Sequence, residues 1–198
     1  MHLIGIITRL QVQTTSLKVG ERNRRSYDPS GIRAVPKLAI TPGGVFGLDD
    51  ENNRLDDVHH RDHPASKNRG DNAISIGFTS HYDEMRQAYG EHLIDGIAGE
   101  NILIAQDLLI GEDDLRHGIA IETSSGTMVQ LDNLIVATPC VEFSRYAMRF
   151  PADQRPDETV TETLQFLNDG MRGYYASYSG PYAEVRVGDR VFVRWPEA

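Results

Sequence analysis

The sequence is poor in cysteine and has no long apolar run. Its single cysteine, Cys140, cannot form a disulfide within the chain, and residues 1–9 lack the basic lead and apolar length of a secretion signal. Both features predict a reducing, cytoplasmic environment. No apolar run approaches the roughly 20 residues that a membrane-spanning helix needs, which argues against a membrane protein.

The sequence also lacks an excess of positive charge. Lys and Arg total 20 against 29 Asp and Glu, a formal net charge of -9 at pH 7. Nucleic acids and anionic membranes are bound through basic surfaces, so this balance argues against both as partners. Basic residues do cluster locally, at Arg22, Arg24 and Arg25 and again at Lys67 and Arg69. Such clusters can still bind a small anion.

The composition and length are those of a globular domain. The chain has 198 residues, of which 39% are hydrophobic and 25% are charged, and we expect one domain over residues 1–198. About ten short strands and two or three helices are expected, with turn residues between the strands. No regular alternation of strand and helix is visible. The pattern therefore favours a mostly β fold with a few helices (α+β), centred on a barrel rather than a parallel sheet.

The expected strands are short and rich in β-branched residues. They cover residues 3–12, 17–25 (weakly), 36–40, 45–47, 73–78, 102–105, 119–123, 127–137, 174–177, 183–187 and 190–195. A tight turn at Gly188-Asp189 is expected to join the last two strands. Residues 49–57 and 59–71 lack periodicity and are expected to be loops.

Two of the expected helices carry capping signals. Ser80 is placed to cap a helix over residues 80–89. Asp157 is placed to cap a second helix that begins at residue 158 and ends at 168 or 169. A third, short helix is expected at 141–150, directly after the cysteine.

Cys140 is the strongest candidate for a functional residue in the sequence. It follows a long expected strand and Pro139, which cannot extend a strand ladder, so its thiol is expected at a strand end near a sheet rim. Arg145 and Arg149 follow within a few turns and could favour the thiolate. The alternative is a buried structural cysteine, since free cysteine is among the most buried residue types.

A histidine cluster lies in the long loop expected at residues 59–71. His59, His60 and His63, with Asp62 between them, place three imidazoles and a carboxylate within five residues. Such a group can form a metal site. However, no glutamate follows the first histidine as in a zincin, and no long helix is expected here. The favoured interpretation is a solvated loop in which one histidine faces a pocket.

Three glycine-containing segments could contact a ligand. In residues 95–101, two glycines next to Glu100 and Asn101 can bring backbone N–H groups close to a ligand, although an ordinary turn has the same pattern. In residues 67–73, basic side chains around a glycine suit an anion, with a solvated turn as the alternative. In residues 170–175, glycines bracket Arg172 and precede two tyrosines, for which barrel packing is the commoner role.

Taken in order, these segments resemble the MOSC domain, the module named after the C-terminal part of molybdenum cofactor sulfurases. The resemblance spans roughly residues 69–193, with residues 3–7 as the family's opening strand. It is carried by Arg69-Gly70-Asp71-Asn72-Ala73, Gly96-Ile97-Ala98-Gly99-Glu100-Asn101-Ile102, Pro139-Cys140, Gly173-Tyr174-Tyr175 and Val187-Gly188-Asp189-Arg190-Val191. The Gly99-Glu100-Asn101 motif and the downstream cysteine are its most specific parts.

The resemblance implies a β-barrel-centred fold and a molybdenum–pterin cofactor, or sulfur destined for one. It assigns to Cys140 either ligation of molybdenum or a persulfide. It also implies that Gly99, Glu100 and Asn101 shape the pocket and that Arg69 and its neighbours hold the pterin phosphate. The cofactor-binding residues expected on this basis are Arg69, Gly70, Asp71, Asn72, Gly99, Glu100, Asn101, Arg145 and Tyr174.

The sequence departs from the family pattern at two places. Many members have an arginine shortly before the cysteine, where this chain has Val136-Ala137-Thr138-Pro139. Many also have His-Gly-Gly before the strand that begins at Ala73, where this chain has Asn68-Arg69-Gly70. Three functions therefore stay open: a molybdenum-dependent oxidoreductase of small N-oxygenated compounds, a sulfur carrier, and a binding module without chemistry. The first would need an electron-transfer partner and the second a cysteine desulfurase, because the sequence shows no motif for either activity.

Overall fold

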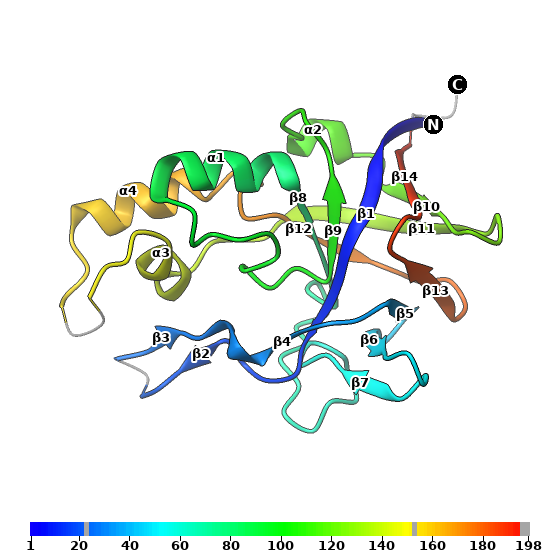
Figure 1. Ribbon diagram of the computed structural model, residues 1–198, viewed down its shortest axis with the longest axis horizontal. Coiled ribbons are helices and arrows are strands. Elements are labelled where there is room, and N and C mark those ends of the chain that lie inside the picture. The colour runs from blue at the N-terminus through cyan, green and yellow to red at the C-terminus, as the bar shows by residue number, and fades with distance from the viewer. Residues whose placement is uncertain (22–23, 152–153, 195–198) are drawn as a thin grey trace.

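The computed structural model describes residues 1–21, 24–151 and 154–194, and within them a closed seven-stranded barrel is the central feature (Figure 1). Around the barrel the strand order is β1-β14-β10-β11-β12-β8-β9, and the pairing of β9 with β1 completes the ring. The barrel strands are β1 (His2–Gln13), β8 (Ile74–Phe78), β9 (Ile102–Ala105), β10 (Ile119–Glu122), β11 (Met128–Val136), β12 (Tyr174–Ser177) and β14 (Arg190–Val193). This confirms the expected mostly β, barrel-centred α+β fold.

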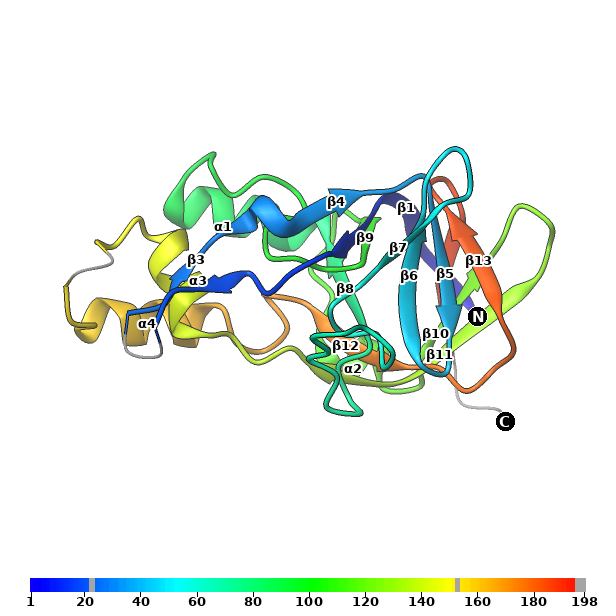
Figure 2. The ribbon, with the colours of Figure 1, turned by 90° about the horizontal axis from the view of Figure 1, so that it is seen from below.

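A smaller antiparallel sheet packs beside the barrel, at the end of the molecule away from α1, α3 and α4 (Figure 2). Its strands, in spatial order, are β13 (Ala183–Arg186), β5 (Lys37–Thr41), β6 (Gly44–Leu48) and β7 (Arg54–Asp56). The long strand β1 passes from the barrel to pair with β4 (Ile32–Ala34). Before β4, the chain forms the short hairpin of β2 (Lys18–Val19) and β3 (Ser26–Tyr27).

In the described part of the chain, four helices lie in the connections between strands, and α1, α3 and α4 gather at the end of the molecule away from the smaller sheet (Figure 2). They are α1 (Thr79–Tyr89), α2 (Glu112–Leu115), α3 (Val141–Ala147) and α4 (Glu158–Phe166), with a 3-10 turn at Pro29–Gly31. Helix α1 links β8 to β9, the one parallel pair among the described strands. Helix α3 packs against both α4 and β3. Among the described residues, no helix combines the length and apolar character needed to cross a membrane.

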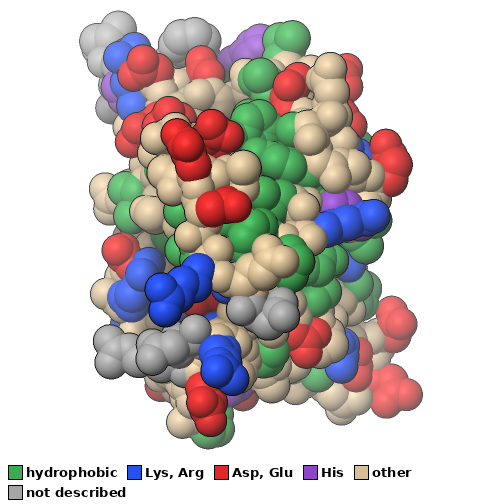
Figure 3. Space-filling view, turned by 90° about the vertical axis from the view of Figure 1, so that its left-hand side faces the viewer, with side chains coloured by type: hydrophobic (Ala, Val, Ile, Leu, Met, Phe, Trp, Pro, Cys, Tyr) green, Lys and Arg blue, Asp and Glu red, His purple; other side chains and the backbone are tan. Residues whose placement is uncertain are grey.

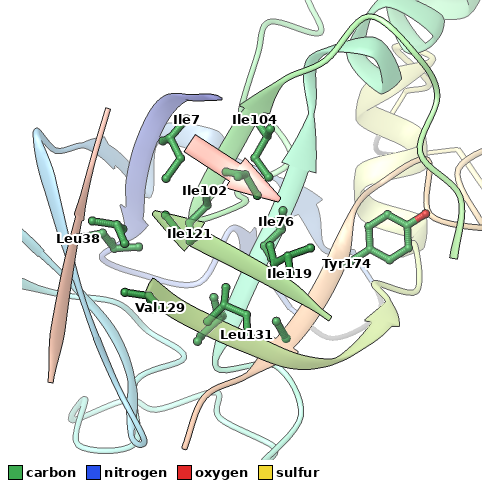
Figure 4. Packing of buried hydrophobic residues seen from close by; sticks show 14 of the residues in the cluster. Ile7, Leu38, Ile76, Ile102, Ile104, Ile119, Ile121, Val129, Leu131 and Tyr174 are labelled. Carbon is green, nitrogen blue, oxygen red and sulfur yellow. The ribbon is translucent and has the colours of Figure 1, made fainter. Parts of the chain in front are cut away.

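The barrel interior is filled by aliphatic side chains from alternating strand positions (Figure 4). In β11, for example, Val129 and Leu131 are buried while Gln130 between them is exposed. Labelled side chains such as Ile7, Ile76 and Ile121 come from different strands of the barrel and pack together inside it, and Leu38 of β5 in the smaller sheet belongs to the same cluster. Burial of each such side chain contributes roughly 1.5–3 kcal/mol, so this layer carries much of the fold's stability.

A second apolar cluster lies under the helices. It joins Tyr82 and Met85 of α1 to Phe143 of α3 and to Tyr27 of the β2–β3 hairpin, and Cys140 packs at its edge. The rings of Tyr27 and Phe143 meet edge to face with centroids 5.0 Å apart. The hairpin is thereby fixed against α3, next to the cysteine.

The helix predictions are partly confirmed. Asp157 caps α4 as expected, because its Oδ1 accepts a hydrogen bond from the backbone N–H of Thr159 at 3.1 Å. The prediction that Ser80 caps α1 is wrong, since the capping position is Phe78. Ser80 lies inside the first turn, where its buried hydroxyl donates to the carbonyl of Leu108 at 2.9 Å. The short helix α2 was not expected from the sequence.

The prediction that the last two strands form a hairpin is wrong. Gly188-Asp189 does make a turn, but β13 pairs with β5 of the smaller sheet while β14 pairs with β1 and β10 of the barrel. The Asp189 carboxylate holds this turn by accepting from the N–H groups of Arg186 at 2.7 Å and Ser124 at 3.0 Å. The expected loop at 49–57 contains strand β7, and Trp195 of the last expected strand lies outside the described residues.

Gly173 is expected to tolerate no side chain. Its φ is +111° and a Cβ there would overlap the backbone carbonyl oxygen of Ile76 in β8. We expect Gly173→Ala to lower the free energy of unfolding by about 2 kcal/mol or more, measured by urea denaturation. Gly126→Ala is the matched control, because Gly126 has φ +80° but nothing within 4 Å of the added Cβ. Equal losses in the two variants would contradict the steric account.

Candidate functional site

A cavity of about 400 Å³ opens where the barrel rim meets the helices and the β2–β3 hairpin. Five of the residues expected at a binding site line it together: Arg69, Asn72, Gly99, Glu100 and Cys140. The remaining lining residues are Gln13, Ser16, Leu17, Lys18, Arg25, Tyr27, Val58, His59, Lys67, Ser75, Thr138, Arg172 and Tyr175. Segments far apart in the sequence thus meet at one place.

The cavity concentrates positive charge on an acidic protein. Its lining contains five cationic side chains, from Lys18, Arg25, Lys67, Arg69 and Arg172, and a single carboxylate. Both basic clusters of the sequence contribute to it, although Arg22 lies outside the described residues. Guanidinium and ammonium groups converging on one space favour a phosphate or another anion of similar size.

Cys140 lies at the N-terminal end of α3, as the residue that precedes the first helical turn. Strand β11 ends at Val136, so the expected position of the thiol just beyond a strand end is confirmed. The Cys140 carbonyl accepts from the N–H of Ser144 at 3.0 Å and from its hydroxyl at 3.1 Å, which fixes the backbone. The side chain is partly exposed and lines the cavity, so it can meet a ligand.

Arg145 does not join the cysteine, contrary to expectation. It lies on a different face of α3, where its Nη2 donates to the carbonyls of Pro151 and Gln154 and its guanidinium lies over the ring of Phe150. Arg145 and Arg149 line a separate pocket beside Tyr146. Figure 3 shows this end of the molecule, where hydrophobic side chains form a band and a group of Lys and Arg side chains lies at its lower left.

Arg172 lines the same cavity as Cys140. Its Nη2 donates to the carbonyl of Ala98 at 3.0 Å, while its Nε is buried and has no partner among the described residues. Burial would lower the pKa of Arg172, but Tyr175, Cys140 and Glu100 raise it well above its ordinary range. The guanidinium therefore stays charged in the cavity wall.

Glu100 is a buried acid with one free oxygen. The Tyr82 hydroxyl donates to its Oε2 at 2.8 Å and itself accepts from the N–H of Ala98 at 3.0 Å, whereas Oε1 has no partner among the described residues. Burial raises the pKa of Glu100, and the charge of Arg172 opposes this only in part. The carboxyl group is thus biased towards holding a proton beside the cavity.

This bias predicts a pH-dependent effect of Glu100→Gln. Because the pKa of Glu100 is higher in the folded than in the unfolded chain, the contribution of Glu100 to the stability of the wild type falls as the pH rises from the unfolded value of about 4.3 until Glu100 is ionised. Glutamine does not ionise, so the free energy of unfolding of the variant should rise relative to wild type over that range. Urea denaturation at several pH values measures it. Glu91→Gln, an exposed control, should show no such trend, and a flat difference for Glu100→Gln would contradict the account.

Asn101, Gly70 and Asp71 do not line the cavity. The Asn101 side chain is buried beneath it, where its Oδ1 accepts from the N–H of Ser75 at 3.0 Å and its Nδ2 donates to Asp57 at 2.9 Å. Gly70 and Asp71 are exposed, and Asp71 lies 3.6 Å from Nε of Arg69. Asn101 therefore supports the cavity rather than contacting its contents.

Tyr174 is also outside the cavity. Successive residues of a strand point to opposite faces, and in β12 Tyr174 points into the core, where its hydroxyl donates to the carbonyl of Ile110 at 2.9 Å. Its neighbour Tyr175 lines the cavity instead. The expected motif was in the right place, but the alternation of the strand selects the other tyrosine.

The three clustered histidines point to different surroundings. His60 is buried, and its ring packs edge to face against Phe46 with centroids 5.9 Å apart. Of the three, only His59 lines the cavity, as expected for one histidine facing a pocket. His63 accepts from the N–H of Ala65 at 3.1 Å. Within the described part of the chain, no group of three or more His, Cys, Asp or Glu side chains could hold a metal ion.

Comparisons with known proteins identify the fold. The model of the MOSC domain family matches residues 55–192, more than half of the chain. A search of curated proteins found no match. Among solved structures, the YuaD protein from Bacillus subtilis is similar with a TM-score of 0.57 and 17% identity, over 96% of this chain and 94% of that one. A hypothetical protein has a TM-score of 0.55 and 11% identity, over 96% of this chain and 66% of that one.

Proposed function

Since the chain belongs to the MOSC domain family, we propose that it binds a molybdenum–pterin cofactor in the Cys140 cavity and reduces small N-oxygenated compounds. The observation that carries the proposal is a partly exposed thiol in a cavity lined by five cationic side chains and one carboxylate. A thiol that must bind metal has to stay reduced, so we place the protein in the cytoplasm.

The residues of the cavity fit such a cofactor. The Cys140 thiolate is a soft ligand of the kind that transition metals such as molybdenum accept. Lys67, Arg69 and Arg172 can bind the pterin phosphate, and the unpartnered Nε of Arg172 is a donor ready for one of its oxygens. Gly99 has φ +91°, and a Cβ there would lie 2.7 Å from Nε2 of Gln13, so glycine is needed for Gln13 to pack this closely against the cavity wall.

The proposed reaction cleaves an N–O bond with two electrons and two protons, giving the reduced nitrogen compound and water. The cofactor would supply the site at which electrons reach the substrate. The chain binds and orients the cofactor through Cys140 and the cationic lining of the cavity. The electrons must come from a partner, such as a flavin or iron–sulfur protein, because the chain carries no motif for either group.

Cofactor analysis tests this function. Wild type is purified from a host that makes the molybdenum–pterin cofactor and from a host that lacks pterin synthesis. We expect molybdenum and pterin in roughly equal amounts in the first preparation and neither in the second, measured by elemental analysis and pterin fluorescence. A wild type without molybdenum and pterin from the competent host would overturn the proposal.

A sulfur carrier is the second candidate. It is favoured by the presence of Cys140 and the Arg172 guanidinium in the wall of one cavity, since a persulfide is anionic and a cationic environment would stabilise it. The test is intact-mass measurement after incubation with a cysteine desulfurase and cysteine. One added sulfur on wild type and none on Cys140→Ser would support it, and equal addition to both would exclude it.

The third candidate, a binding module without chemistry, predicts a buried and unreactive cysteine. Cys140 is instead partly exposed and lines the cavity, which weighs against this candidate. A native-state thiol reagent should therefore modify Cys140.

A further inference from the structure

Asp57 is a buried carboxylate at the base of the cavity, and it accepts four hydrogen bonds. Oδ1 accepts from the backbone N–H of His59 at 2.8 Å and from Nδ1 of its ring at 3.0 Å. Oδ2 accepts from the N–H of Gln13 at 2.8 Å and from Nδ2 of Asn101 at 2.9 Å. The side chain is fully buried, so its orientation is set by these donors rather than by solvent.

This arrangement selects one tautomer of His59. Because the carboxylate can only accept at this position, Nδ1 must carry the hydrogen, and in the neutral ring Nε2 is left with a free lone pair. The described residues provide no hydrogen bond to Nε2, and the His59 ring lines the cavity that contains Cys140. The amide of Asn68 holds the backbone of this segment by donating to the His59 carbonyl at 2.8 Å.

We propose that His59 is the proton donor of the reaction and that Asp57 and Asn101 are its positioning residues. The inference rests on the proposed reduction of N-oxygenated compounds and adds to it the source of a proton. It also gives Asn101 a role, since the amide of the Gly99-Glu100-Asn101 motif orients Asp57 instead of contacting the cofactor. Among the ionisable side chains of the cavity wall, the remaining groups are cationic except Cys140, Glu100 and two tyrosines.

The proton balance of the step is simple. When the N–O bond breaks, the departing oxygen takes one proton from Nε2 of the protonated His59 and a second from solvent, and leaves as water. The two electrons come from the external flavin or iron–sulfur donor. Nε2 then recovers its proton from water through the open side of the cavity, while Nδ1–H stays bonded to Asp57 throughout. A general acid held in this way contributes typically 10²–10⁴-fold to a rate.

The tautomer of His59 can be determined on the protein without its cofactor. Nitrogen NMR of the histidine rings in cofactor-free wild type should show His59 with hydrogen on Nδ1 and a free Nε2. Addition of inorganic phosphate should shift the Nε2 signal of His59, because phosphate enters the cationic cavity, and should leave the exposed His117 unchanged. A ring with hydrogen on Nε2 and none on Nδ1, or no response to phosphate, would overturn the proposal.

Kinetics of the loaded protein separate this proposal from the proposed function. His59→Gln should keep the wild-type content of molybdenum and pterin but lose kcat by about 100-fold or more, whereas the control His117→Gln keeps kcat. Asp57→Asn should move the hydrogen to Nε2 and lower kcat. If Asp57→Asn does not fold, His59→Gln decides alone. If kcat is unchanged in the cofactor-loaded His59→Gln variant, the assignment of His59 as proton donor is overturned and the proposed function stands. If the wild type takes up no molybdenum, the proposed function itself is overturned.

Discussion

Replacing Cys140 by alanine is expected to lower the molybdenum retained by the purified protein about 100-fold or more. Loss of outer-shell partners of a metal site already costs about 10–100-fold in affinity, and Cys140 is the ligand itself in the proposed site. No other cysteine is present in the chain to replace it. Elemental analysis after dialysis measures the effect.

The fold should survive this substitution. Cys140 is partly exposed at the edge of the helical cluster, so alanine removes little buried surface, and the carbonyl that accepts from Ser144 is retained. The control variant is Ser125→Ala, an exposed position in the turn between β10 and β11, which should keep its molybdenum. Retention of wild-type molybdenum by folded Cys140→Ala would show that the thiol is no ligand.

Arg172→Gln is expected to have the second-largest effect, on the pterin. A hydrogen bond to a charged group contributes about 1.5–3 kcal/mol, and about 2 kcal/mol corresponds to roughly 30-fold in affinity. Arg172 lies in the wall of the cavity beside Cys140 and Glu100, where water screens its charge little. The pterin content after dialysis, measured by fluorescence, should fall accordingly.

The matched control is Arg33→Gln. Arg33 is exposed on β4, and among the described residues its guanidinium donates to two nearby backbone carbonyls, those of Ser30 and Ile32. Its loss removes the same formal charge from the protein without touching the cavity. If both variants lose pterin equally, the effect is one of net charge and Arg172 has no special role.

The barrel could be predicted from the sequence because its strands alternate or run apolar over short lengths bounded by turns. β11 is an example, with Val129 and Leu131 buried and Gln130 exposed. The partners of a strand are not encoded in that local pattern. The tight turn at Gly188-Asp189 favoured a hairpin, but β14 reaches β1, at the other end of the chain, and closure of the barrel prevails.

The site could be predicted only where its residues belong to recognisable motifs. Cys140, Glu100 and Arg69 were expected, and they meet in one cavity. Arg145 was expected from its closeness in sequence, but the direction of a side chain on α3 depends on helical phase. Lys18 comes from a hairpin whose docking on α3 depends on long-range packing. The sequence marked Arg172 only by its position between two glycines, which did not predict that it lines the cavity.

The most direct test of the central claim is X-ray absorption spectroscopy at the molybdenum edge. We predict that loaded wild type shows one more sulfur ligand than loaded Cys140→Ser, in which an oxygen takes the place of the thiolate. Reconstitution with excess cofactor keeps enough molybdenum on the variant for the measurement. Identical sulfur coordination in the two proteins would contradict the assignment of Cys140 as the ligand, whatever the enzyme's activity.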